Sequence, residues 1–132
     1  MVQKSLKTKV VFEAYEGDEP YLFISYSHAD TDAVYRIMNR LDKEKFRIWF
    51  DDTMEVGEDF RDELKVKIEK CAAFVLFVSK ASMDSKYCGM EIITAYKNNK
   101  KIYPIYLEED VEIPSALKLM LENLQHVNGM SV

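Results

Sequence analysis

Short apolar runs alternate with helix-like segments along most of the chain, and this alternation restricts the possible folds more than any other feature. The runs are rich in β-branched and aromatic residues, as strands covered on both faces are. Four are clear and a fifth is shorter: Tyr21–Ser25, Phe46–Phe50, Ala72–Ser79, Ile102–Leu107 and Gln125–Val127. Strands that alternate with helices indicate βα units around a parallel sheet.

The segments between these runs carry apolar residues at helical spacing. Val34, Ile37, Met38 and Leu41 recur at offsets 0, 3, 4 and 7, which predicts an amphipathic helix. Three further helices are predicted: one with Phe60, Leu64 and Ile68 that ends near Cys71, one with Met90, Ile93, Ala95 and Tyr96 that ends at Asn98–Asn99, and one that begins near Pro114 and carries Leu117, Met120, Leu121 and Leu124.

Two features modify this pattern. Residues Lys80–Lys86 follow the third strand and are predicted to be a loop that leads into the helix with Tyr87 and Glu91. Pro104 has no amide donor, so the fourth strand is predicted to lie near an edge of the sheet or to be irregular there.

The length of the chain predicts one domain. A chain of 132 residues with 48% hydrophobic residues can bury a single core. Residues 1–19 show no comparable pattern and end in the turn Gly17–Pro20, so we expect a linker or N-terminal extension there and the domain itself over residues 20–132.

Composition excludes several classes of function. The net charge of −5, without a basic arm, argues against a nucleic-acid partner. Neither a secretory signal nor a membrane span is present, so a cytoplasmic location without membrane contact is expected. Cys71 and Cys88 form no C-x-x-C pair, and His28 and His126 have no close partner, so no metal site is predicted.

Ligands of an open parallel sheet bind at the carboxyl ends of the strands, so the loops there are the places to search. Three loops qualify: Tyr26–Asp30, Asp51–Glu58, and Lys80–Lys86 with the following helix. None has a G-x-G-x-x-G or P-loop pattern, which excludes the usual dehydrogenase and P-loop sites. The second loop is acidic and would repel a pyrophosphate unless a ribose or cation meets it. The third strand ends without the carboxylate that a response-regulator receiver needs.

Tyr87 and Glu91 are four residues apart, where the third loop enters a helix. This spacing places a phenol ring and a carboxylate on one helix face, one turn apart. Such a pair can hold a flat aromatic base beside an acid. By residue type alone, however, most helical glutamates are simply solvated, so both interpretations remain open at this point.

Four segments taken together resemble the TIR (Toll/interleukin-1 receptor) domain, and specifically its bacterial type. They follow one another in the family's order over residues 21 to about 127. They are Tyr21–His28 (YLFISYSH), Arg47–Asp51 (RIWFD), Phe77–Ser79 (FVS), and Tyr87–Glu91 (YCGME), which is similar to the family's aromatic-Cys-x-x-Glu element.

The resemblance implies a fold and an activity. The fold is a flavodoxin-like, doubly wound parallel sheet of five strands in the order 2-1-3-4-5, with helices on both faces. The activity, found in many members, is cleavage of NAD+ to nicotinamide and ADP-ribose or a cyclic product, so NAD+ is a substrate and no cofactor is expected.

The resemblance also implies a role for individual residues. Glu91 aligns with the glutamate on which cleavage depends, and Tyr87 with an aromatic residue, often tryptophan, that packs at the substrate. Tyr26, Ser27 and His28 match the loop that lines the nucleotide, where some relatives carry arginine. Asp51 stands at the mouth of a loop that in relatives opens and closes over the site and serves assembly.

At the level of the family, partners and biology follow as well. We expect self-association with other TIR domains, an attached sensor or effector domain, and a part in immune or stress signalling such as antiviral defence. The alternative is a non-catalytic interaction module that only mediates assembly between TIR domains. The two hypotheses differ in whether NAD+ is consumed.

Overall fold

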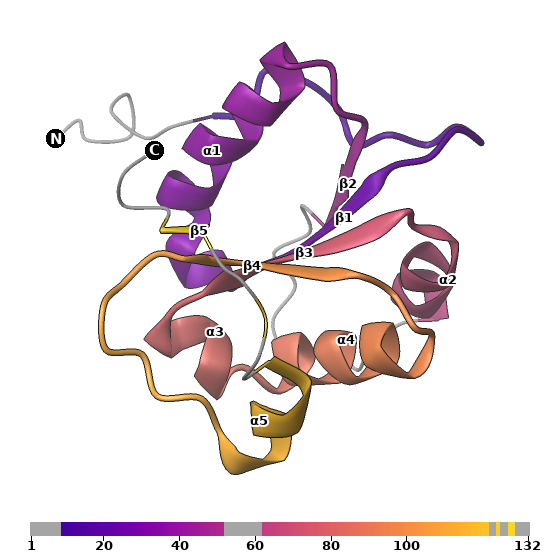
Figure 1. The fold of residues 1–132 in the computed structure, drawn as a ribbon. Helices are drawn as coiled ribbons and strands as arrows, with labels where there is room; N and C mark the ends of the chain where they lie inside the picture. Colours follow the sequence, from indigo (N-terminus) through magenta and orange to yellow (C-terminus); the bar gives the residue numbers. More distant parts are fainter. Residues whose placement is uncertain (1–8, 52–61, 122–123, 125–126, 129–132) are drawn as a thin grey trace, which may run out of the picture.

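The structure, a computed structural model, describes residues 9–51, 62–121, 124 and 127–128. Strands and helices alternate along the chain (Figure 1). In order they are β1 (Leu22–Ser25), the 3₁₀ turn η2 (His28–Asp30), α1 (Thr31–Lys43), β2 (Ile48–Phe50), α2 (Asp62–Lys70), β3 (Ala73–Val78), α3 (Lys80–Asp84), α4 (Lys86–Lys97), β4 (Ile102–Tyr106), α5 (Ser115–Leu121) and β5 (Val127–Asn128).

The five strands form one parallel sheet in the order β2-β1-β3-β4-β5. This is the predicted order, and the predicted fold class is confirmed. Because β1 lies between β2 and β3 and all three run in the same direction, their carboxyl ends meet at one edge of the sheet.

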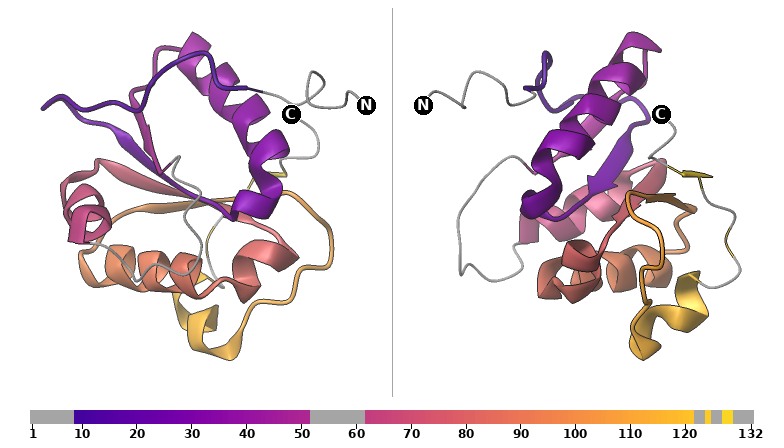
Figure 2. Two further views of the ribbon diagram at one scale, coloured as in Figure 1. Left: turned by 180° about the vertical axis from the view of Figure 1, so that it is seen from behind. Right: turned by 90° about the vertical axis from the view of Figure 1, so that its left-hand side faces the viewer.

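Helices cover both faces of the sheet, with α1 on one face and α2, α3, α4 and α5 on the other (Figures 1 and 2). Side chains alternate between the two faces along each strand. Phe23 of β1 therefore packs in the core under α2 and α4, together with Leu64 and Ile92. Its neighbour Ile24 packs in the core under α1.

Three aromatic rings extend across the centre of the first of these cores. Phe23 lies opposite Trp49 of β2 and opposite Phe74 of β3 in the register of the sheet. Its ring centroid is 5.2 Å from that of Trp49 and 5.4 Å from that of Phe74, with interplanar angles of 24° and 5°. This row of rings ties three neighbouring strands together beneath the helices.

Helices α1, α2 and α5 bury residues of their predicted stripes. For α4 the predicted stripe was wrong in part: the helix buries Cys88, Glu91, Ile92 and Ala95, so Ala95 alone of the predicted residues is buried, and Tyr96 is exposed. One helix was not predicted at all. Lys80–Lys86 was predicted to be a loop, but Lys80–Asp84 form α3. The sequence carries no helical stripe there because the helix is held at its start by a capping box rather than by an apolar face. The side chain of Ser79 accepts from the amide of Ser82, and the side chain of Ser82 accepts from the amide of Ser79.

Two other predictions concern the ends of elements. Phe60 at the start of the second helix and Gln125 at the start of the fifth strand lie outside the described residues. Pro104 lies in β4, next to the edge strand β5, as predicted. Pro104 pairs with Leu76 of β3, and the described residues of β5 pair with Ile105 and Tyr106.

The described part of the N-terminal segment packs beside β2 and α2. The carboxylate of Glu16 accepts hydrogen bonds from the indole of Trp49 at 3.1 Å and from the ammonium group of Lys67 at 2.7 Å. The boundary between residues 1–19 and the domain stays a prediction. These contacts connect residue 16 to strand β2 and to helix α2.

Candidate functional site

The predicted site residues follow the carboxyl ends of the three neighbouring strands β2, β1 and β3. Those ends lie side by side in the sheet, so the loops after them form one rim. The structure describes all six residues: Tyr26, Ser27 and His28 after β1, Asp51 after β2, and Tyr87 and Glu91 in α4 after β3. Of the predicted loop Asp51–Glu58, only Asp51 lies within the described residues.

Tyr26 joins the loops after β1 and β2. Its side chain is buried, and its hydroxyl donates a hydrogen bond of 2.9 Å to the backbone carbonyl of Asp51. The ring stacks on the imidazole of His28, with centroids 5.0 Å apart. Ser27 caps η2 by accepting from the amide of Ala29. The loop thus has a fixed geometry, and the half-buried side chains of Ser27 and His28 remain at the surface of the rim.

Glu91 is buried, with 8% of its surface exposed, so the interpretation as a solvated helical glutamate is wrong. Its helix begins at Ser85, whose side chain accepts from the amide of Cys88. The hydroxyl of Ser25, the last residue of β1, donates a hydrogen bond of 2.6 Å to Oε1 of Glu91. A buried carboxylate needs such partners, because its desolvation would otherwise be too costly.

Tyr87 lies one turn before Glu91 in α4 and has 36% of its surface exposed. Side chains in a helix lean toward its N-terminus, so the carboxylate of Glu91 leans toward the turn that carries Tyr87. The structure thus has Tyr87 at the surface and Glu91 buried, one turn apart in the same helix. That the ring and the carboxylate form one binding surface stays a prediction.

Cys88 is a packed thiol rather than a nucleophile. Burial, followed by the negative charge of Glu91, raises the pKa of Cys88 to about 12, and Asp30 adds to the rise. The thiol is protonated at neutral pH, and it is the thiolate that attacks or binds metals. Within the described residues no group of three or more His, Cys, Asp and Glu side chains is arranged to hold a metal ion.

A second serine–carboxylate bond lies on the rim, between residues that the sequence did not mark as a pair. Ser79, which follows β3, donates from its hydroxyl to Oδ2 of Asp30 at 2.5 Å. Asp30 precedes α1 but makes no capping bond with its side chain, which serves this contact instead. The bond fastens the loop after β1 to the start of α3. One sequence feature could have indicated such bonds: the apolar runs of β1 and β3 each end in a serine, Ser25 and Ser79.

Asp30 should make the stability of the domain depend on pH. Burial and the nearby charge of Glu108 raise the pKa of Asp30, and the Ser79 hydrogen bond only partly opposes them. A carboxyl whose pKa is higher in the folded state stabilises the fold fully below its unfolded pKa, and this stabilisation is lost as pH rises through the folded pKa. From about pH 4 upward, the free energy of unfolding should therefore fall because of this group.

Urea unfolding of wild type and Asp30→Asn at pH values between about 4 and 7 measures this effect. In Asp30→Asn the free energy of unfolding should fall less with rising pH over the lower part of this range. In Ser79→Ala the free energy of unfolding should fall more steeply, because this variant lacks the hydrogen bond that favours the ionised carboxyl of Asp30. A wild-type slope in both variants would contradict the assignment.

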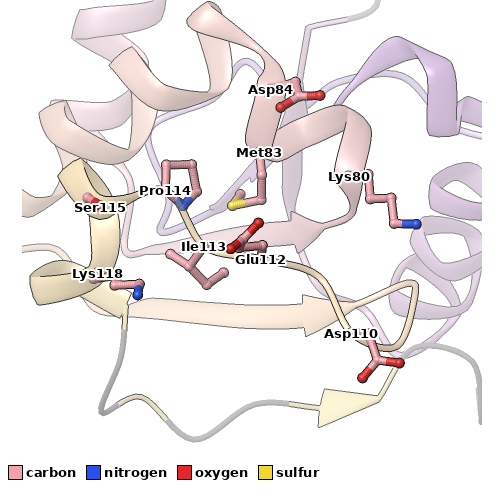
Figure 3. A pocket seen from close by; sticks show the side chains of 9 residues that line it. All are labelled: Lys80, Met83, Asp84, Asp110, Glu112, Ile113, Pro114, Ser115 and Lys118. Carbon is pink, nitrogen blue, oxygen red and sulfur yellow. The ribbon is translucent and has the colours of Figure 1, made fainter.

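A groove of about 460 Å³ lies between α3, the segment before α5, and α5 itself (Figure 3). Charged side chains of both signs line it together with three apolar residues. The lining consists of Lys80, Met83, Asp84, Asp110, Glu112, Ile113, Pro114, Ser115 and Lys118. None of the predicted site residues lines this groove.

A comparison with known families decides what kind of domain this is. The sequence model of the TIR domain matches residues 22–131. The chain belongs to the TIR-domain family. The match covers the whole sheet and all six predicted site residues, so the TIR domain of this chain contains the rim described above. A comparison with curated proteins found no match.

Solved structures of TIR domains share the fold. The TIR domain of the Toll-related receptor TRR-2 from Hydra magnipapillata superposes with a TM-score of 0.63 at 18% identity, covering 80% of this chain and 81% of that one. The TIR domains of the activated Roq1 resistosome, which recognises the pathogen effector XopQ, superpose with a TM-score of 0.61 at 22% identity. That match covers 70% of this chain and 60% of the Roq1 chain. At these identities the likeness concerns the fold alone.

No helix in the described part of this TIR domain has the length and apolar character that crossing a membrane requires.

Proposed function

We propose that this TIR domain cleaves NAD+ at the bond between nicotinamide and ribose, with Glu91 as the catalytic residue. The observation that carries the proposal is the position of Glu91. It is a buried carboxylate at the carboxyl edge of β1 and β3, in the aromatic-Cys-x-x-Glu element of a TIR domain. An acid that is costly to bury, at the edge where α/β sheets bind ligands, is a candidate for chemistry rather than for stability.

The reaction suits a single carboxylate. When the glycosidic bond breaks, its electron pair leaves with the nicotinamide nitrogen, and the ribose becomes an oxocarbenium-like cation. Nicotinamide departs as a neutral molecule, so no general acid is needed. Water then adds to the ribose carbon and releases a proton, which gives ADP-ribose; attack by the adenine ring instead gives a cyclic product. The carboxylate stabilises the cation and can orient the ribose through its hydroxyls.

The other rim residues have distinct proposed roles. Tyr87 is accessible and would stack on a flat ring of the substrate. Ser27 and His28 are half-buried and would line the nucleotide. Tyr26 is buried, so it would act mainly by holding the loop of Asp51 against that of His28. In this proposal the rim residues bind the substrate beside the carboxylate of Glu91.

Tyr87→Ala should raise the KM for NAD+ about 5- to 50-fold, because stacking of a base on an aromatic ring contributes about 1–3 kcal/mol. The matched variant Tyr87→Trp should keep or lower the wild-type KM, since its ring is larger. Initial rates of nicotinamide release over a range of NAD+ concentrations measure both. If alanine and tryptophan gave the same KM, Tyr87 would not stack on the substrate.

The proposal is tested by incubating the purified domain with NAD+ and quantifying nicotinamide, ADP-ribose and cyclic products by chromatography. If assembly activates the enzyme, the specific activity should rise with protein concentration. No nicotinamide at any concentration, including concentrations at which the domain is associated, would refute the proposal.

One observation favours the alternative that the domain serves only for assembly: the Roq1 TIR domains with the same fold belong to a resistosome. Under this hypothesis the domain associates with other TIR domains while NAD+ stays intact. Sedimentation, measured alongside the chromatography, distinguishes the two hypotheses. Association without release of nicotinamide supports the assembly-only domain. Nicotinamide release that rises with association supports the NAD+-cleaving enzyme. In either case we propose a cytoplasmic signalling role in immunity or stress, with an attached sensor or effector domain.

A further inference from the structure

Strand β1 ends in a serine that hydrogen-bonds to the proposed catalytic residue Glu91. Ser25 is the last residue of β1 and is fully buried. Its position is fixed by the sheet, because β1 is paired on both sides and Ser25 itself is paired with Leu76 of β3. A side chain on such a strand is a rigid reference point for a group on a neighbouring helix.

Ser25 donates a short hydrogen bond to the carboxylate of Glu91. Its Oγ lies 2.6 Å from Oε1 of Glu91, in the range of a strong O–H···O⁻ bond. The buried thiol of Cys88 lies one turn before Glu91 in the same helix.

We propose that Ser25 is a positioning residue, which fixes the orientation of the Glu91 carboxylate at the rim. It would touch no reacting atom and would act only through Glu91. The catalytic consequence rests on the proposed function, whereas the orientation itself does not. Misplacing a catalytic group by about 1 Å can cost about 10²-fold in rate, so a small, buried serine would matter for turnover.

A purely structural role for Ser25 predicts a different result, and Ser82 provides the control. Ser82 is also a buried serine with two hydrogen bonds, but both are to the backbone of Ser79 in the capping box. Replacing either serine by alanine removes a buried hydroxyl and destabilises the domain by a similar mechanism. Only the Ser25 change removes a hydrogen bond to a carboxylate.

The experiment compares wild type, Ser25→Ala, Ser25→Thr and Ser82→Ala by two measurements. For nicotinamide release, Ser25→Ala should lower kcat about 10- to 100-fold with KM within about threefold of wild type. Ser25→Thr should recover most of the kcat, because it restores a hydroxyl. Ser82→Ala should keep kcat within about threefold at a temperature where it is folded. If Ser25→Ala does not fold, Ser25→Cys replaces it, since the thiol has a similar size and is a weaker donor.

The second measurement is independent of activity. In protein labelled at the side-chain carboxyl carbon of glutamate, the NMR signal of Glu91, assigned with Glu91→Gln, should move in Ser25→Ala and stay in place in Ser82→Ala. An unmoved signal would overturn the proposal, as would equal losses of kcat in the two alanine variants. A wild-type domain that releases no nicotinamide would refute the proposed function, while the NMR signal would still decide whether Ser25 orients Glu91.

Discussion

Glu91→Gln should lower kcat for nicotinamide release about 10²-fold while leaving the Kd for NAD+ within about threefold of the wild-type value. The amide has nearly the size of the carboxylate, and its carbonyl oxygen can still accept the hydrogen bond from Ser25. What the substitution removes is the negative charge. At about 4 Å and an effective dielectric constant near 20, that charge stabilises a cation by about 4 kcal/mol.

Only part of this energy raises the rate, because the nicotinamide ring of NAD+ is already cationic in the ground state. If about 3 kcal/mol is specific to the transition state, the loss corresponds to about 10²-fold. Calorimetry with NAD+ gives the Kd, and initial rates give kcat. The control is Glu69→Gln, which removes the charge of an exposed helical glutamate in α2 and should change neither quantity. A variant that lost binding and retained kcat would assign Glu91 to substrate affinity instead.

Phe23→Ala should lower the free energy of unfolding by about 3–5 kcal/mol. The Phe23 side chain is fully buried, and its ring packs between those of Trp49 and Phe74. Its removal leaves a cavity in the middle of three neighbouring strands and also breaks two ring contacts. Because domains of this size are stable by only about 5–15 kcal/mol, a large part of the population can unfold.

Urea unfolding at a fixed pH measures this loss. Tyr103→Ala is the matched control, because Tyr103 is also an aromatic residue of a strand paired on both sides but is 46% exposed. It should cost less than about 1 kcal/mol. If both variants lost the same free energy of unfolding, the row of rings would not be a main source of stability in the core.

The sequence predicts the fold well because the information for it is local and repetitive. The strand-like runs are apolar on both faces, and the stripe of Val34, Ile37 and Met38 defines one helix face that the structure buries. The strand order followed from the family resemblance and not from the pattern. Helix α3 was missed because its start depends on a hydrogen-bond exchange between Ser79 and Ser82, which apolar periodicity does not detect.

The candidate site was predictable in its members but not in its contacts. The i, i+4 spacing of Tyr87 and Glu91 and the positions of the loops could be obtained from the sequence. The burial of Glu91 could not, since a helical glutamate is exposed by default and its partner Ser25 is 66 residues away. The link between Asp30 and Ser79 likewise joins residues 49 positions apart. Such pairs exist only once β1 and β3 are neighbours in the sheet.

We propose that the buried carboxylate of Glu91 makes this TIR domain an NAD+-cleaving enzyme. The most direct test follows nicotinamide release from NAD+ by wild type and Glu91→Ala at the same protein concentration, with folding of both checked by circular dichroism. We expect release by wild type and only the uncatalysed background with Glu91→Ala. Equal rates of release by the two proteins would contradict the claim.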